Sequence, residues 1–199
     1  LRAFARGEDT SPVKVMDPAK ADVDYVVKGI GNGLTAPHDL ECESDVKALV
    51  WLLSESVAQR LRESRLRCRT ISVGARWARD LTGYSRQTTV RVPTCLTKDV
   101  ANFAMGLLRA NQTFDKDHAL RAIHVRVTNL VPMDAPVQCD LFGDAAEVVR
   151  MERLDLAIDA LRVRFGNTCV KRAVELTDDV MSGLDIKRDN TVHPIGFLR

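Results

Sequence analysis

Apolar residues recur along this chain with two different periods, one of three to four residues and one of two. The longer period covers Ser44 to Leu66 and returns from Lys98 to about Ala110, so the pattern predicts an amphipathic helix in each segment. Thr97 stands where the second helix needs an N-cap. The two apolar stripes are Val46, Leu49, Val50, Leu53, Val57 and Leu61 in the first helix, and Val100, Phe103, Ala104, Leu107 and Leu108 in the second.

The period of two predicts strands in three segments, Arg67 to Arg79, Tyr84 to Val92 and Leu120 to Thr128. A fourth strand is expected from Tyr25 to Thr35, although alternate glycines weaken it. The order is strand, helix, strand, strand, helix, strand. This order predicts an α+β domain in which a four-stranded antiparallel sheet has both helices on one face and its other face open.

The residues expected on the open face are short, polar or basic, which makes that face unsuitable as a core. In the last strand Ile123, Val125 and Val127 alternate with His124 and Arg126. In the first strand of the central hairpin, Ile71, Val73, Ala75 and Trp77 alternate with Thr70, Ser72, Gly74 and Arg76, and in its second strand Ser85, Gln87 and Thr89 alternate with Arg86 and Thr88.

Positive charge is concentrated in this hairpin and the helix end before it. From Arg60 to Arg91 there are nine arginines and two acids, a local charge of +7 in a chain whose net charge is +2. Such an excess indicates an anionic ligand, nucleic acid above all. Arg67 and Arg69 share a face with Ile71, so they are expected to serve mainly at the solvated start of the strand. Arg76 and Arg86 are the pair from which we expect most of the binding.

The composition changes after Pro132. Met133 to Ala160 holds seven acids and two arginines, and a helix is predicted from Asp144 to about Arg164, with Gly166 as its stop. Leu154, Ile158, Leu161 and Phe165 would form its packing or self-association face. The residues beyond it lack a strong period, and part of them is expected to be mobile.

Several classes of protein are not indicated. No apolar run is long enough to span a membrane, and no secretory signal is recognisable, so a cytoplasmic protein is expected. The histidines and carboxylates form no catalytic or metal-binding group. The missing initiator methionine suggests a piece of a longer protein. The cysteines are expected to be reduced, buried apolar residues, namely Cys42, Cys68, Cys95, Cys139 and Cys169.

Five short motifs, in order, resemble the C-terminal part of a Y-family translesion DNA polymerase of the DNA polymerase IV type. The resemblance covers roughly residues 1 to 142 and implies the end of a thumb domain at 1–13, a linker at 14–23, a little finger DNA-binding domain at 24–131, a clamp-binding tether at 132–143 and a helical extension at 144–199. The motifs are Gly7-x-Asp9-x-x-Pro12-Val13, Lys28-Gly29-Ile30-Gly31-Asn32 before Thr35, Arg60-Leu61-Arg62, Arg86-Gln87-Thr88 and Arg121-x-Ile123-x-Val125.

The resemblance implies that the open sheet binds the backbone of template-primer duplex DNA. Arginines and hydroxyl groups contact phosphates without reading bases, so binding should tolerate any sequence and weaken with salt. Ala122 stands where the family often has a basic residue, and His124 stands where it often has glycine. These two departures suggest that the last strand binds DNA less strongly than in other members of the family. The implied phosphate contacts are Lys28, Gly29, Ile30, Gly31, Arg76, Ser85, Arg86, Arg121 and Arg126.

A second partner is implied by Gln138-Cys139-Asp140-Leu141-Phe142, which resembles the peptide by which bacterial polymerases bind the sliding clamp. Gln138 would supply polar anchors, while Leu141 and Phe142 would fill an apolar pocket. A turn packed on its own domain is the alternative. The resemblance places catalysis by two magnesium ions in a palm domain outside this chain, so neither a cofactor nor a catalytic residue is expected within it.

Two other classes of protein stay open. The first is a free-standing single-strand RNA-binding module, for which Trp77 and Tyr84 are the available stacking aromatics. The second is a protein-interaction or dimerisation module that uses the C-terminal helix. Preference for duplex DNA over single strands would favour the polymerase interpretation.

Overall fold

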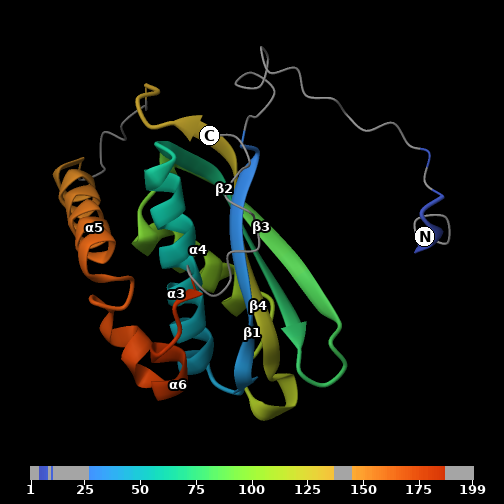
Figure 1. The fold of residues 1–199 in the computed structure, drawn as a ribbon. Coiled ribbons are helices and arrows are strands. Elements are labelled where there is room, and N and C mark those ends of the chain that lie inside the picture. The colour runs from blue at the N-terminus through green and yellow to red at the C-terminus, as the bar shows by residue number, and fades with distance from the viewer. Residues whose placement is uncertain (1–4, 9, 11–26, 137–144, 187–199) are drawn as a thin grey trace.

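The computed structural model describes residues 5–8, 10, 27–136 and 145–186. Its central feature is a four-stranded antiparallel sheet with strand order β1-β4-β2-β3 (Figure 1). The strands are β1 (Gly29–Leu40), β2 (Leu66–Trp77), β3 (Gly83–Thr94) and β4 (Leu120–Pro132). The helices between them are α3 (Glu43–Glu63) and α4 (Thr97–Arg109), followed by a 3-10 turn, η1 (Lys116–His118). This architecture confirms the predicted α+β fold.

Each helix connects two parallel strands that are not neighbours in the sheet. An antiparallel strand lies between the two strands of each pair. Helix α3 links β1 to β2 across β4, and α4 links β3 to β4 across β2. Both helices therefore return over the same side of the sheet, as right-handed crossovers require. Figure 1 shows them together on one side, with the other side of the sheet bare.

The core lies between these helices and the sheet, where the two hydrophobic periods meet. All six apolar residues predicted for α3 are fully buried, as are Ile71 and Val73 of β2 and Val125 and Val127 of β4. The stripe of α4 is shifted from the prediction, because Ala101 and Met105 are buried whereas Phe103 is exposed. Thr97 is the first residue of α4 and not its N-cap, which is Leu96.

Beyond the sheet domain, α5 (Ala145–Phe165) forms a third layer outside α3 (Figure 1). Within this chain most of the predicted apolar face of α5 is not buried, and its use in self-association stays a prediction. Leu154, Leu161 and Phe165 are exposed, and the buried residues of α5 are Asp155 and Arg162. The physical reason is that the surface of α3 facing α5 carries buried charged side chains, so α5 meets it with charges of the opposite sign.

The segment after α5, which the sequence pattern left unassigned, folds back onto α3 and β1. It contains η2 (Ala173–Thr177) and α6 (Asp179–Ser182), and Gly166 ends α5 with a positive φ of 95°. Met181 and Ile186 enter the main hydrophobic core. Asp178 accepts a hydrogen bond from His38 of β1 at 2.5 Å, which fixes the start of α6.

Four of the five cysteines lie in the described part, and all four are free thiols. Cys68 and Cys95 are buried, and burial raises the pKa of Cys68 to about 12, so that thiol is inert. Cys42 and Cys169 are exposed, which corrects the expectation of burial for these two. None of the helices in the described ranges is long and apolar enough to cross a membrane.

Candidate nucleic-acid interface

The open face of the sheet is defined by the pairing of its strands, because residues directly opposite one another in neighbouring strands point to the same side. Asn32 of β1 donates to the Ser56 hydroxyl of α3 at 3.0 Å, so Asn32 and its partner Val125 face the helices. The neighbouring positions face away. Three successive rows of them cross the sheet: Gly31, Arg126, Ser72 and Gln87; Gly33, His124, Gly74 and Ser85; Thr35, Ala122, Arg76 and Gly83.

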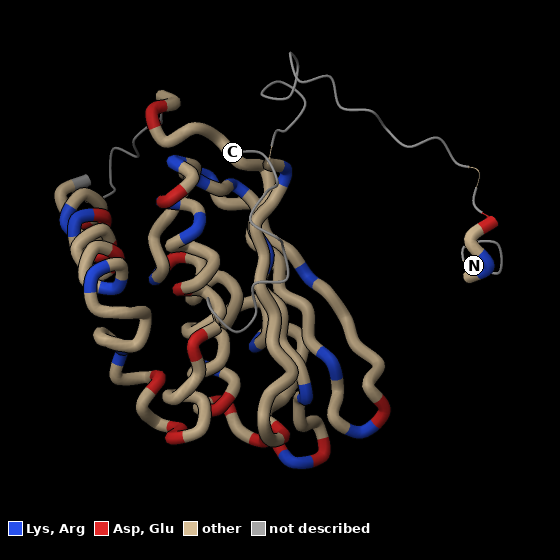
Figure 2. Tube along the Cα trace, viewed as in Figure 1, with Lys and Arg blue, Asp and Glu red and all other residues tan. Residues whose placement is uncertain are grey.

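These three rows, which we call the open face, contain basic groups without acids. Arg76, Arg126 and His124 are exposed, and none of their side chains makes a hydrogen bond or ion pair with any described residue; the Arg126 backbone carbonyl accepts from the Ser72 hydroxyl. In Figure 2 Lys and Arg mark the strands, whereas Asp and Glu near the sheet lie at its turns. The open face is thus a polar surface whose cationic side chains have no partner in the described part of the chain.

Glycines in β1 make room for the side chains of β4. A Cβ on Gly31 would lie 3.1 Å from the Cβ of Arg126, and one on Gly33 would lie 3.0 Å from the Cβ of His124. Both distances are tighter than normal packing, so the absence of a side chain in β1 lets Arg126 and His124 lean towards the sheet edge. The glycines of β1 therefore have a steric role, since they leave room for the side chains of β4.

The backbone of β1 lies at the edge of the sheet, since only β4 pairs with it. Arg60 of α3 donates to the Gly31 carbonyl at 3.0 Å, which shows that the polar groups of Gly31 point away from β4. Gly29 and Gly31 border Arg126, and Lys28 precedes them as an exposed residue. Ile30 faces the core with only 4% exposure, so its backbone alone could take part in binding.

Two predicted contacts lie elsewhere. Arg86 pairs with Val73, an inward-facing residue, so it is on the helix side of the edge strand β3. There its Nε donates to the Asn111 side chain at 2.9 Å, and its guanidinium lies 5.5 Å from the centre of the Tyr84 ring. Arg121 pairs with Asp39 at 3.2 Å near the end of β4. The expectation that Arg76 and Arg86 form one pair is therefore corrected by the register.

Four of the predicted contacts come together on the open face, namely Gly31, Arg76, Ser85 and Arg126. The Ser85 hydroxyl donates to the Val73 carbonyl at 3.3 Å, which leaves its oxygen as an acceptor. Ser72 and Gln87, which lie in the same row as Arg126, were not among the predicted contacts. Their polarity was visible in the sequence, but their distance from Arg126 depends on the pairing of three strands.

On the side of the helical layer that faces away from the sheet, arginines form ion pairs with carboxylates. Arg62 of α3 donates to Asp159 at 2.6 Å and to Asp155 at 3.2 Å. Glu55 of α3 accepts from Arg162 at 2.5 Å and from Arg172 at 2.6 Å. Three carboxylates and three guanidinium groups thus balance one another between α3 and the C-terminal extension. We call this set, Glu55, Arg62, Asp155, Asp159, Arg162 and Arg172, the ionic cluster.

The ionic cluster also completes helix α4. Asp155 accepts a hydrogen bond from the Thr97 backbone N–H at 2.9 Å, so a carboxylate from α5 satisfies a donor at the α4 N-terminus. Burial alone would lower the pKa of Arg62, but the hydrogen bond and charge of Asp159, with the charge of Asp155, raise it. Arg62 consequently stays charged, and the extension is joined to the sheet domain by buried ion pairs.

Glu175 of η2 is an additional buried carboxyl group beside this balanced cluster. Burial, followed by the charge of Glu55 and a hydrogen bond to it, raises the pKa of Glu175 to about 7. One Glu175 oxygen has no hydrogen-bond partner among the described residues. The protonated form therefore fits this site best, because the guanidinium groups nearby are already matched by carboxylates.

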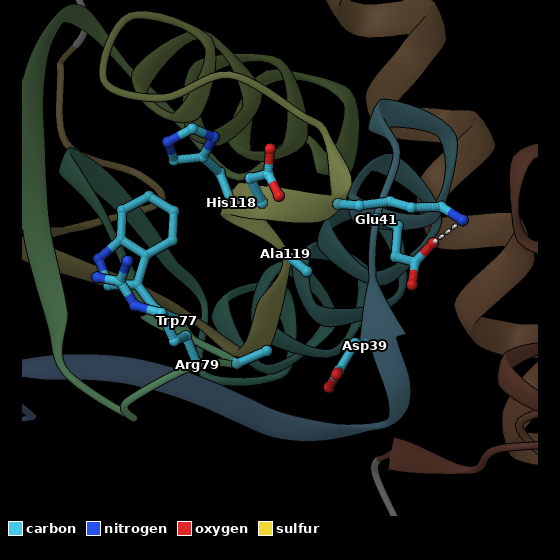
Figure 3. Close-up of a pocket in the computed structure, with 9 residues that line it drawn as sticks. Asp39, Glu41, Trp77, Arg79, His118 and Ala119 are labelled. Carbon is cyan, nitrogen blue, oxygen red and sulfur yellow. Dashed lines mark ion pairs between the residues drawn. The ribbon is translucent and has the colours of Figure 1, made fainter.

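A hollow of about 490 Å³ lies at the end of the sheet beside the β2–β3 turn (Figure 3). Its lining includes Asp39, Glu41 and Asp117 as well as Arg79 and Lys116, so acids outnumber bases. Lys116 pairs with Glu41 at 3.7 Å, as the dashed line shows. This balance of charge does not suit a phosphate. Nor do the described residues contain a group of His, Cys, Asp or Glu placed to hold a metal ion.

Fold and site together define an α+β domain that covers one side of its sheet with helices and presents unpaired cations on the other. Residues 27–141 match the family model described as the impB/mucB/samB family C-terminal domain. Because this match covers more than half of the chain, the chain belongs to that family. The resemblance to the C-terminal part of a Y-family polymerase is confirmed.

Relatives of this chain carry the name DNA polymerase IV. The protein of that name from Acetivibrio thermocellus is 39% identical over 178 residues, which is 89% of this chain and 43% of the relative. DNA polymerase IV 2 from Bacillus subtilis is 34% identical over 179 residues, 87% of this chain and 40% of the relative. A solved structure entitled "Complex of beta-clamp processivity factor and little finger domain of PolIV" matches with a TM-score of 0.43 and 18% identity, over 58% of this chain and 99% of that one.

The chain spans about two fifths of the length of these curated relatives. The match to the Acetivibrio thermocellus protein extends over 89% of this chain, which is a larger share than the part of the chain that precedes α5. The relative therefore shares part of the C-terminal extension as well as the sheet domain.

Proposed function

We propose that this chain is the duplex-binding and clamp-tethering region of an error-prone, lesion-bypass DNA polymerase. The enzyme to which it belongs would be a DNA-directed nucleotidyltransferase, and its catalytic palm with two magnesium ions would lie outside these residues. The open face would bind the backbone of template-primer DNA, and Gln138, Leu141 and Phe142 would bind the sliding clamp. The expected contacts on the open face are Lys28, Gly29, Ile30, Gly31, Arg76, Ser85 and Arg126.

The observation that carries this proposal is the contrast in pairing between arginines. Arg62 and Arg162 on the helix side are matched by carboxylates and Arg60 by a carbonyl, whereas the side chains of Arg76 and Arg126 on the open face have no such partner among the described residues. An exposed cation without a partner remains available to a phosphate and releases counterions when it binds one. Hydroxyl groups and glycine backbone beside these arginines can accept a nucleic-acid backbone without reading its bases.

The surface suits a duplex better than a single strand. Modules that bind single-stranded RNA on a sheet stack bases on exposed aromatic rings. Trp77 and Tyr84 pack against each other with ring centroids 5.7 Å apart, and the Tyr84 hydroxyl donates to Gln112. The open face itself holds no Phe, Tyr or Trp among its three rows. The RNA-binding alternative therefore lacks the side chains that it needs.

Affinity for DNA as a function of salt tests the proposal. The chain should bind a duplex more tightly than a single strand of equal length, and the affinity should fall steeply as salt rises. Replacing Arg76 and Arg126 together by alanine should weaken duplex binding and reduce the salt dependence by about two counterions. Equal affinity for both nucleic acids, or no effect of the double substitution, would contradict the proposal.

The clamp-binding residues lie outside the described residues, and the support for them is the sequence motif and its place directly before α5. Replacing Leu141 and Phe142 by alanine should abolish binding to a bacterial sliding clamp while duplex affinity stays unchanged. Gel filtration of the chain alone with light scattering addresses the dimerisation alternative, which the exposed Leu154, Leu161 and Phe165 would favour. Clamp binding that survives the double substitution would remove the tether from the proposal.

A further inference from the structure

His124 occupies the centre of the open face. It lies in the middle row, with Gly33 of β1 on one side and Gly74 of β2 on the other. Neither neighbour has a side chain, and a Cβ at Gly74 would be only in ordinary contact with the imidazole Nδ1, at 3.6 Å. The ring is exposed and has no hydrogen-bond partner among the described residues. A ligand that binds the ring therefore has no hydrogen bond to a described residue to displace.

The charges around His124 come from two arginines and no acid. Along β4 the nearest residue on the same face is Arg126, two positions away, which places the two side chains about 7 Å apart. On β2 the next row carries Arg76, while β1 and β3 contribute only uncharged residues to the three rows, namely Gly31, Gly33, Thr35, Gly83, Ser85 and Gln87. A proton on the imidazole would thus be repelled by its neighbours until an anion is bound between them.

We propose that His124 binds a backbone phosphate of the duplex together with Arg126, and that it takes up a proton when it does so. This inference rests on the proposed function of the open face and adds a residue and a pH dependence to it. In the free protein, partial desolvation of the ring and then the charge of Arg126 lower the pKa of His124. A phosphate next to both groups reverses the second effect, because it attracts the imidazolium and neutralises the repulsion.

The direction of the pH effect follows from linkage. Binding raises the pKa of His124, so the complex holds more protons than the free protein at any pH between the free and bound values. Affinity for duplex DNA should therefore increase as the pH falls from about 7.5 to about 5.5. A shift of one pKa unit corresponds to a tenfold change, and an increase of roughly 3- to 10-fold is expected.

Substitutions at position 124 distinguish the effect of the imidazole charge from the effect of the shape of the side chain. His124→Gln keeps a polar side chain between the two glycines but cannot be protonated, so its duplex affinity should equal the neutral-pH value of the wild type and change little with pH. His124→Arg carries a permanent charge, so it should bind at pH 7.5 at least as tightly as the wild type at pH 5.5. His118→Gln serves as the control, because His118 is exposed and already paired with Asp115 away from the open face.

The experiment measures the affinity of the whole chain for a duplex of fixed length at several pH values, in parallel with calorimetry in two buffers of different ionisation enthalpy. Proton uptake by the wild type and by His118→Gln, and its loss in His124→Gln, is the expected result. The same pH profile in wild type and His124→Gln, with binding still lost on removal of Arg76 and Arg126, would overturn the role of His124 alone. Absence of duplex binding at every pH would overturn the proposed function as well.

Inorganic phosphate provides a second probe. If phosphate alone shifts the ring signals of His124 in a nuclear magnetic resonance titration and raises its pKa, the two cations bind a single anion without the rest of the duplex. Duplex DNA should raise the same pKa at much lower concentration, since neighbouring contacts add to its affinity. A pKa that neither phosphate nor duplex changes would contradict the inference.

Discussion

On the helix-covered side of the sheet Arg62 and Arg162 are each 7% exposed and are bonded to carboxylates, whereas on the open side Arg76 and Arg126 are exposed and their side chains pair with none of the described residues. Arg62 and Arg162 could not be buried without their carboxylate partners, because a buried unpaired charge costs several kcal/mol. The side chains of Arg76 and Arg126 form no stabilising ion pair with any described residue. The comparison separates arginines that hold the fold together from arginines that are free to bind something else.

The largest expected effect comes from the helix-covered side. Replacing Asp155 by alanine would leave Arg62 and Arg172 partly unpaired and would remove the acceptor of the Thr97 N–H. A loss of about 3–5 kcal/mol in the free energy of unfolding is expected, measured by urea denaturation. Asp117→Ala, at an exposed turn, is the matched control and should stay within about 0.5 kcal/mol of wild type. A loss below about 1 kcal/mol for Asp155→Ala would show that the ionic cluster is not needed for stability.

The open side should respond in the opposite way. With Arg76 and Arg126 both replaced by alanine, the free energy of unfolding should stay within about 0.5 kcal/mol of wild type, because neither side chain has a partner to lose. Affinity for duplex DNA should fall roughly 10- to 100-fold at low salt. Fluorescence anisotropy with a labelled duplex measures the affinity. A large loss of stability without loss of affinity would reverse the assignment of the two sides.

Glu175 adds a pH dependence to the helix-covered side. Its folded pKa of about 7 lies above the usual value of 4.5, so the folded state binds the proton more tightly than the unfolded state. The stability of the wild type should therefore decrease as the pH rises from about 4.5 to about 7, by roughly 1–3 kcal/mol. Glu175→Gln should remove this part of the dependence. Parallel stability curves for the two proteins across this range would exclude Glu175 as the titrating group.

Replacing Arg86 is expected to have the smallest effect on duplex affinity and stability. It also tests the strand register most directly. It was expected to contribute to binding together with Arg76, but it contacts Asn111 and Tyr84 on the helix side. Arg86→Ala should lower duplex affinity less than about threefold and stability by about 0.5–1 kcal/mol, through the lost hydrogen bond and cation–π contact. An affinity loss as large as that of Arg126→Ala would place Arg86 in the interface after all.

The sequence predicted the sheet domain well, because each strand and helix carries its own period. Val46 to Leu61 in α3 and Ile71 with Val73 in β2 are buried as the pattern indicates. Face assignment within a strand also followed from alternation, as with Arg126 outward and Val125 inward. Alternation alone could not show which face of one strand continues the face of its neighbour. Only the register shows that Arg86 of β3 and Arg76 of β2 lie on opposite faces of the sheet.

The C-terminal extension shows the other limit of the hydrophobic pattern. Leu154, Leu161 and Phe165 predicted a packing face, yet α5 contacts α3 through charges. A polar contact of this kind depends on matching acids with arginines that lie about a hundred residues away, and no local period reports it. The same holds for Met181, whose burial depends on how residues 166–186 return to the core.

A nuclear magnetic resonance titration of the isotope-labelled chain with duplex DNA tests the central claim most directly. The largest shifts should fall on backbone amides of the open face, at Gly31, Ser72, Arg76, His124 and Arg126, while the amides around Arg62 and Asp155 stay in place. Raising the salt concentration should reverse the shifts. Shifts that gather instead on α3 and α5, or at the hollow beside Trp77, would contradict the assignment of the open face as the DNA-binding surface.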